Sequence, residues 1–210
     1  MKRALTVNNI LNKKRKYITW GGSDAAEMKA AFGTPESCGV WFVWAKSGNG
    51  KSSFIMRLIK ALSPNGNILF NAKEELGSVS FTNKLLEHRI NDLKAKILFV
   101  EEDMAELEVR LDKRNSPKIV VIDSVQYVEL SYKEYKRIKE KYADKIFILI
   151  SHEEGNKPVG RGAVKMQFDA YMKIRVEGYK AFCKGREIGA NGGIFTIWEE
   201  GAERYWGETI

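Results

Sequence analysis

The chain has 210 residues, of which 44% are hydrophobic, and it carries a formal net charge of +8. This length and composition argue against disorder and predict a single domain with a substantial core. No apolar run reaches membrane-spanning length, and residues 1–16 lack the long apolar stretch of a secretory signal, so we expect a cytoplasmic protein without membrane contact. Cys38 and Cys183 belong to no cysteine or histidine cluster, which argues against a disulfide framework and a structural zinc.

Positive charge is concentrated at the N-terminus. Residues 1–16 contain six basic residues and no acidic one, whereas the rest of the chain has 29 basic and 27 acidic residues. We therefore predict a basic N-terminal arm over residues 1–20, followed by one domain over residues 21–210. The arm would either contact nucleic-acid phosphates or remain a solvated tail that aids solubility.

Short apolar runs alternate with amphipathic stretches along most of the chain. The runs predicted to be strands are residues 40–44, 67–72, 96–100, 118–123 and 145–151. Helical spacing of apolar residues predicts helices at residues 54–62, 81–90, 105–114 and 132–145. Strands that are apolar almost throughout, separated by helices, predict an α/β fold with a mainly parallel sheet covered on both faces. After residue 168, alternating apolar and polar residues around glycine turns predict an antiparallel C-terminal extension of that sheet.

A glycine-rich segment connects the first predicted strand to the helix after it. Gly48 and Gly50 would let successive backbone N–H groups converge on an anion at the positive end of this helix. Lys51 would reach the β- and γ-phosphates of a nucleotide, and the Ser52 hydroxyl would bind Mg²⁺. The segment is a Walker A loop with alanine in place of the first glycine; the alternative is an ordinary glycine-rich turn. The predicted nucleotide-binding residues are Ala45, Lys46, Ser47, Gly48, Asn49, Gly50, Lys51, Ser52 and Ser53.

Asp123 ends the apolar run at residues 119–122. In an open α/β sheet this position lies at the C-terminal edge of a strand, where ligands bind. An aspartate that ends an apolar strand is more often a helix cap or a turn former. Because a phosphate-binding loop also needs a carboxylate that holds the metal ion, we predict that Asp123 is a Walker B residue and a magnesium ligand with Ser52.

Further segments resemble the ATPase core of the RecA-like group, especially DnaB-type replicative helicases and the RadA recombination factor. They are residues 68–75, 120–124, 148–152 and 160–174, followed by Lys184-Gly185-Arg186. With the Walker A loop, the resemblance spans residues 40–198. It implies a RecA-like P-loop NTPase core that binds ATP and Mg²⁺ and assembles into a ring or filament.

The resemblance assigns catalytic roles to two residues near the predicted nucleotide. Glu74 corresponds to the glutamate that polarises the attacking water, and His152 corresponds to a polar sensor at the end of a strand. Alternation along an extended strand favours Glu74 over Glu75, since only one of them can face the nucleotide. The alternatives are that both acids belong to a helix N-terminus, where the dipole favours them, and that His152 is a structural histidine.

Lys184 and Arg186 resemble the Lys-x-Arg motif that this family inserts into the ATP site of the neighbouring subunit. Being two residues apart on a predicted strand, their side chains would project from one face and stabilise charge on the leaving phosphate. A solvated strand face is the alternative.

Residues 153–165 form a predicted loop after the sensor strand. In RecA-like proteins the corresponding loop contacts single-stranded DNA. Lys157, Arg161 and Lys165 would here hold backbone phosphates. A mobile surface loop without a ligand is the alternative.

Taken together, these features predict an oligomeric ATPase that hydrolyses ATP with Mg²⁺ and acts on single-stranded DNA in recombination or replication. Two alternatives stay open. A P-loop kinase would transfer phosphate to a small substrate and would need an arginine-rich lid, which the sequence does not show. A non-hydrolysing nucleotide-dependent adaptor would keep Lys51 and Asp123 but would not need Glu74.

Overall fold

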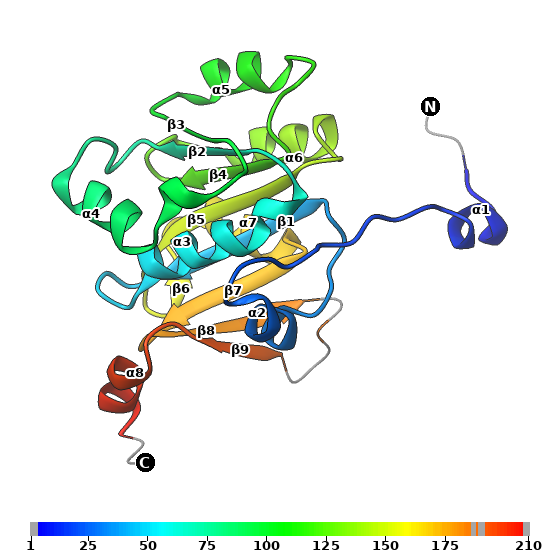
Figure 1. Cartoon of the computed structure of the whole chain (residues 1–210). Coiled ribbons are helices and arrows are strands. Elements are labelled where there is room, and N and C mark those ends of the chain that lie inside the picture. Colours follow the sequence, from blue (N-terminus) through cyan, green and yellow to red (C-terminus); the bar gives the residue numbers. More distant parts are fainter. Residues whose placement is uncertain (1–3, 186–187, 189–191, 208–210) are drawn as a thin grey trace.

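A computed structural model describes residues 4–185, 188 and 192–207, and shows one central sheet with helices on both faces (Figure 1). The strand order is β3-β2-β4-β5-β1-β7-β8-β9, and β6 pairs with β5. The strands are β1 (Gly39–Ala45), β2 (Ile68–Ala72), β3 (Ile97–Val100), β4 (Ile119–Asp123), β5 (Ile146–Glu154), β6 (Lys157–Pro158), β7 (Met172–Glu177), β8 (Lys180–Gly185) and β9 (Gly193–Thr196). The α-helices are α1 (Val7–Leu11), α2 (Ala25–Phe32), α3 (Lys51–Leu62), α4 (Val79–Glu87), α5 (Met104–Leu111), α6 (Tyr132–Lys141), α7 (Arg161–Asp169) and α8 (Glu199–Trp206). The α/β prediction of a mainly parallel sheet flanked by helices is confirmed.

Strands β1 to β5 are parallel and form the centre of the fold. Alternate residues of β1 enter two separate hydrophobic clusters. Trp41 and Val43 pack with residues of α2, α3 and α4, whereas Val40 and Phe42 pack with residues of α5, α6 and α7. Because both faces are covered, the strand is apolar at every position after Gly39, as a central parallel strand should be.

The C-terminal strands differ in direction from the predicted extension. β8 and β9 are antiparallel to their neighbours, as expected, but β7 runs parallel to β1. The reason is that α7 provides the crossover connection that a parallel strand requires. The alternating pattern predicted a strand over residues 192–200, but its last two residues, Glu199 and Glu200, begin α8 (Glu199–Trp206), where the helix dipole favours acids. No helix in the described part of the chain is long and apolar enough to cross a membrane.

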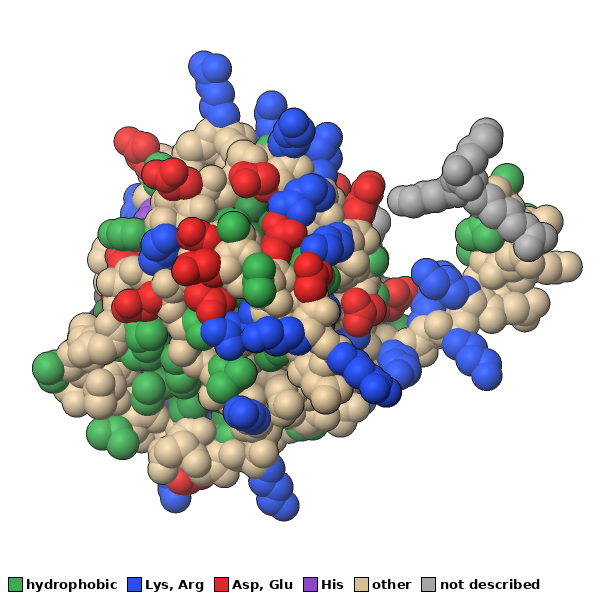
Figure 2. Space-filling view, turned by 90° about the horizontal axis from the view of Figure 1, so that it is seen from above, with side chains coloured by type: hydrophobic (Ala, Val, Ile, Leu, Met, Phe, Trp, Pro, Cys, Tyr) green, Lys and Arg blue, Asp and Glu red, His purple; other side chains and the backbone are tan. Residues whose placement is uncertain are grey.

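Helix α1, in the predicted N-terminal arm, stands apart from the body of the protein (Figure 1). It buries no residue. The chain joins the body where Arg15 pairs with Glu36 at 3.0 Å and Ile18 enters the core. In the space-filling view, basic side chains gather along the arm, whereas acidic and basic side chains intermingle over the body (Figure 2).

Candidate functional site

The loop at residues 45–53 turns directly from β1 into α3 at the C-terminal edge of the sheet. Gly48 and Gly50 adopt φ angles of 78° and 90°, in the left-handed region that favours glycine. Gly50 is also the N-cap of α3 and offers no side-chain acceptor to the helix N–H groups. These amides, together with the helix dipole, therefore provide the donors of an anion site.

Asn49 ties this loop to the hairpin between β7 and β8. Its side-chain Oδ1 accepts a hydrogen bond from the Gly178 N–H at 2.8 Å, and its backbone oxygen accepts one from the Tyr179 N–H at 3.3 Å. A Cβ at Gly50 would lie 3.1 Å from the Tyr179 ring, so the hairpin lies close against the loop. Asn49 lay within the predicted motif, but the sequence contained no signal for its partner.

Asp123 converges on the loop from β4. Its Oδ1 lies 4.0 Å from Lys51 Nζ, and this oxygen is buried without a hydrogen-bond partner among the described residues. Burial raises the pKa of the Asp123 carboxyl above its usual range, and the Lys51 ammonium opposes that rise. A buried carboxylate oxygen that lacks a donor fits a cationic partner.

Ser52 and Asp123 fit the magnesium site that the sequence predicts. No group of three or more histidine, cysteine, aspartate or glutamate side chains within the described ranges forms a metal site on its own. Mg²⁺ commonly uses one or two protein oxygens and completes its shell with phosphate oxygens and water. The unpartnered oxygen of Asp123 and the Ser52 hydroxyl at the start of α3 match that chemistry.

A cavity of about 220 Å³ lies at this edge. Its lining is made by the loop and by residues from three other places in the chain: Lys46, Ser47, Gly48, Gly50, Lys51, Ser52, Ser53, Glu74, Glu75, Lys84 and His152. Of the predicted nucleotide-binding residues, Ala45 and Asn49 do not line it. Lys84, from α4, adds a positive charge, although nothing in the sequence distinguished it from other helix lysines.

Glu74 and His152 meet in this cavity. His152 Nε2 lies 3.4 Å from Glu74 Oε2, although His152 lies within β5 and Glu74 lies in the turn that follows β2. The argument that preferred Glu74 was wrong in its premise, because β2 ends at Ala72 and residues 73–77 form turns, so Glu75 also lines the cavity. The contact with His152 distinguishes Glu74 instead.

The sensor position is linked to the loop after Asp123. Gln126 Nε2 donates hydrogen bonds to Ser151 Oγ at 2.7 Å and to the Val159 oxygen at 2.9 Å. The Ser151 hydroxyl in turn donates to the His152 oxygen at 2.9 Å. This network joins the ends of β4 and β5 to the start of α7, and the sequence did not indicate Gln126.

The remaining predicted residues lie elsewhere. Residues 153–165 were predicted to be a loop, but β5 continues to Glu154, β6 pairs back on it, and α7 begins at Arg161. Lys157 is therefore on a short hairpin, whereas Arg161 and Lys165 lie one turn apart on a helix, and all three are exposed. Lys184, on β8, lines a different cavity, and Arg186 lies outside the described residues.

Comparisons with known proteins agree with this architecture. No family model and no curated protein matches the sequence. The structure resembles the flagellar accessory protein FlaH from Methanocaldococcus jannaschii, with a TM-score of 0.61 and 17% identity over 86% of this chain and 93% of that one. It resembles the ATPase domain of a DnaB-like protein, with a TM-score of 0.56 and 15% identity over 89% of each chain. It also resembles a KaiC-like protein from Pyrococcus horikoshii OT3, with a TM-score of 0.53 and 19% identity over 87% of this chain and 98% of that one.

The fold and the comparisons define the class. The chain has the RecA-like P-loop fold, as the sequence resemblance predicted. At these identities the likeness concerns the fold, so the roles of individual residues depend on the geometry described above.

Proposed function

We propose that the protein binds ATP with Mg²⁺ and hydrolyses it. The observation that carries the proposal is the buried Oδ1 of Asp123, which has no hydrogen-bond donor among the described residues and faces Lys51 beside the amides at the N-terminus of α3. One of the structures that this chain resembles is described as an ATPase domain, which supports the same activity.

Each residue of the site has a defined task in such a reaction. The loop amides and Lys51 bind the β- and γ-phosphates and hold the terminal phosphate in place. Ser52 and Asp123 would hold Mg²⁺, whose charge offsets that of the phosphates. Glu74 orients a water in line with the γ-phosphate and draws its proton, and His152, 3.4 Å away, orients the Glu74 carboxylate. His152 would also transmit the state of the nucleotide to β5 and α7.

We further propose that the protein acts on single-stranded DNA as a homo-oligomer, in recombination or replication. The support is the basic N-terminal arm and the resemblance of Lys184 and Arg186 to residues that complete a neighbouring subunit's ATP site. If these residues act across an interface, dilution to monomers should lower the turnover per subunit.

The experiment is the formation of ADP and of free phosphate from ATP with Mg²⁺, measured with and without single-stranded DNA. DNA-stimulated release supports the proposal, turnover only with an added small acceptor indicates a kinase, and nucleotide binding without turnover indicates an adaptor. Lys51→Ala should abolish nucleotide binding or turnover, while the exposed Lys133→Ala on α6 is the matched control and should behave as wild type. Full activity of Lys51→Ala would contradict the assignment of the loop.

A further inference from the structure

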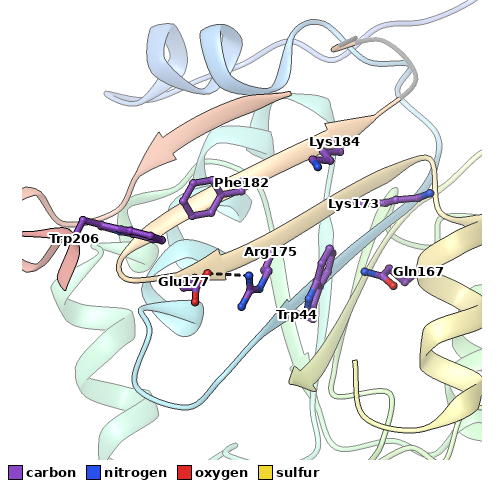
Figure 3. Close-up of a pocket in the computed structure, with 8 residues that line it drawn as sticks. All are labelled: Trp44, Gln167, Lys173, Arg175, Glu177, Phe182, Lys184 and Trp206. Carbon is purple, nitrogen blue, oxygen red and sulfur yellow. Dashed lines mark ion pairs between the residues drawn. The ribbon is translucent and has the colours of Figure 1, made fainter. Parts of the chain in front are cut away.

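The face of β7 and β8 that points away from α3 lines a cavity of about 470 Å³ (Figure 3). Along β7, Met172, Ile174 and Val176 are buried in the core on the other face, so Lys173, Arg175 and Glu177 point into this cavity. β8 adds Phe182 and Lys184 to the same face. We call this surface the hairpin face.

Aromatic side chains border the hairpin face on two sides. Phe182 and Trp206 contact each other edge to face, with ring centroids 5.7 Å apart. The Trp206 indole N–H donates a hydrogen bond to the Gly178 oxygen at 3.1 Å, which fixes the ring while 39% of the residue stays exposed. Trp44, from β1, lines the opposite side (Figure 3). Rings that are held in place at a solvent-facing surface are suited to stacking.

Two lysines on this face have no counter-charge among the residues that the structure describes. Lys173 and Lys184 are direct partners in the antiparallel register of β7 and β8, a position at which like charges destabilise a sheet. Neither forms an ion pair with any residue in the described part of the chain. Lys173 Nζ lies over the Phe168 ring, 5.7 Å from its centroid. An anion bound between them would relieve the repulsion.

The third cation of the face has a different task. Arg175 forms ion pairs with Glu153 and Glu177, each at 2.8 Å, and a hydrogen bond with Asn156 at 2.9 Å. Its guanidinium is therefore occupied by carboxylates. The positive charge that remains for an external anion comes from the lysines.

From this surface we infer that the hairpin face binds single-stranded nucleic acid, with phosphates at Lys173 and Lys184 and bases stacked on Phe182 and Trp206. Proteins bind single strands through grooves in which cations follow the backbone and aromatic rings receive the bases, and an exposed sheet face with aromatic residues serves in this way. A duplex hides the faces of its bases and cannot use these rings. The inference rests on the proposed function for its partner, and assigns that partner to a different surface from Lys157, Arg161 and Lys165.

The hairpin face is joined to the nucleotide site by neighbouring residues. Trp44 directly precedes Ala45, the first residue of the phosphate loop. Glu153, which holds Arg175, directly follows His152, and its side chain is only 1% exposed. A nucleic-acid strand that moves Trp44 or Arg175 on binding would therefore act on residues adjacent to the nucleotide site.

The test is binding of fluorescein-labelled oligothymidine to the full chain, followed by anisotropy over a range of salt concentrations. Phe182→Ala should weaken binding roughly tenfold, the effect of losing one stacked base. Lys173→Gln should weaken it and lower the salt dependence by about 0.7 of a counterion. Binding of an ATP analogue and the melting temperature show whether each variant folds. If Phe182→Ala does not fold, Lys173→Gln provides the test.

Each outcome decides a different statement. Wild-type affinity of both hairpin variants, with loss of binding when Lys157, Arg161 and Lys165 are changed to Gln, would overturn the inference and place the nucleic acid on β6 and α7. Equal affinity for a duplex, or variants that dissociate an oligomer without affecting oligothymidine binding, would also overturn it. ATP turnover without any binding of oligothymidine would overturn this inference and the DNA partner alone, whereas absence of nucleotide binding would remove the proposed ATPase. Binding of oligouridine with the same affinity as oligothymidine would support a single-strand site that does not discriminate ribose from deoxyribose.

Discussion

Strand β1 separates two parts of the sheet that are covered differently. On one side, β4 and β5 are buried on both faces, between α3 and α4 on one face and α5 and α6 on the other. On the other side, β7 and β8 pack against the core with one face and line a cavity with the opposite face. The residue pattern reflects how many faces of each strand are buried. β4, buried on both faces, reads Ile-Val-Val-Ile, whereas β7, buried on one face, alternates apolar and charged residues.

The two parts also present chemistry in different ways. In the covered part, the strands present their functional groups toward their C-terminal ends, so Asp123 on β4 and His152 on β5 meet the phosphate loop at one edge. In the half-covered part, polar and aromatic groups stand on the strand face itself. A compact ligand with concentrated charge suits the edge, and an extended ligand suits the face.

The largest expected effect tests the edge. Glu74→Gln should retain ATP binding and lower the rate of phosphate release by roughly 10²–10⁴, the contribution of a positioned general base. The measurement is single-turnover hydrolysis beside a binding titration with the same nucleotide. Glu75→Gln is the matched control, because Glu75 lines the same cavity without the contact to His152, and should lose much less. Equal losses in both variants would remove the distinction between the two acids.

The next effect compares the two faces of one strand. Ile174 is fully buried, and Ile174→Ala should lower the free energy of unfolding by roughly 2–5 kcal/mol. Its neighbour Lys173 points to the hairpin face, and Lys173→Gln should change that free energy by less than about 0.5 kcal/mol. Urea unfolding measures both. A large loss for Lys173→Gln would show that the hairpin face is packed rather than open.

The edge was more predictable from sequence than the face. The Walker A loop depends on local requirements, namely glycines where φ is positive and a lysine at the start of a helix, and these are visible in nine consecutive residues. Asp123 follows from an apolar run of strand length. The argument from strand alternation for Glu74 failed because the end of β2 at Ala72 is set by the turn after it, which apolar spacing does not show.

The hairpin face depends on contacts between distant segments. The alternation in β7 predicted a strand with one polar face, and that was correct. Sequence could not show that Trp206, from a helix predicted in part to be a strand, packs against Phe182, or that Trp44 borders the same cavity. Nor could it show that β7 is parallel to β1, since the direction depends on α7 acting as a crossover.

A smaller effect concerns the link between the two parts. Asn49→Ala removes the acceptor of the Gly178 N–H and should lower the free energy of unfolding by about 1 kcal/mol, together with the affinity for ATP. Asn49→Asp keeps that acceptor, but it loses the Nδ2 donor to the Lys46 and Ser47 oxygens and places a negative charge beside the phosphates. We expect it to lose stability within the phosphate loop while keeping the bond to the hairpin, and to bind ATP more weakly than Asn49→Ala; urea unfolding and calorimetry measure the two effects. Wild-type stability of Asn49→Ala would mean that the hairpin holds the loop by the Tyr179 N–H bond to the Asn49 backbone oxygen and by packing at Gly50.

The smallest effect is a dependence on pH within the covered part. Burial lowers the pKa of His88, at the end of α4, below its ordinary value of 6.5, and its Nε2 has no described hydrogen-bond partner. A histidine with a lowered folded pKa contributes stability above its unfolded pKa, and loses it as pH falls from 6.5 towards the folded value, because the unfolded chain binds the proton first. His88→Leu removes this component. As the pH falls from about 7.5 to about 5, wild type should therefore lose free energy of unfolding relative to His88→Leu. A difference that stays constant would show that water reaches the His88 ring.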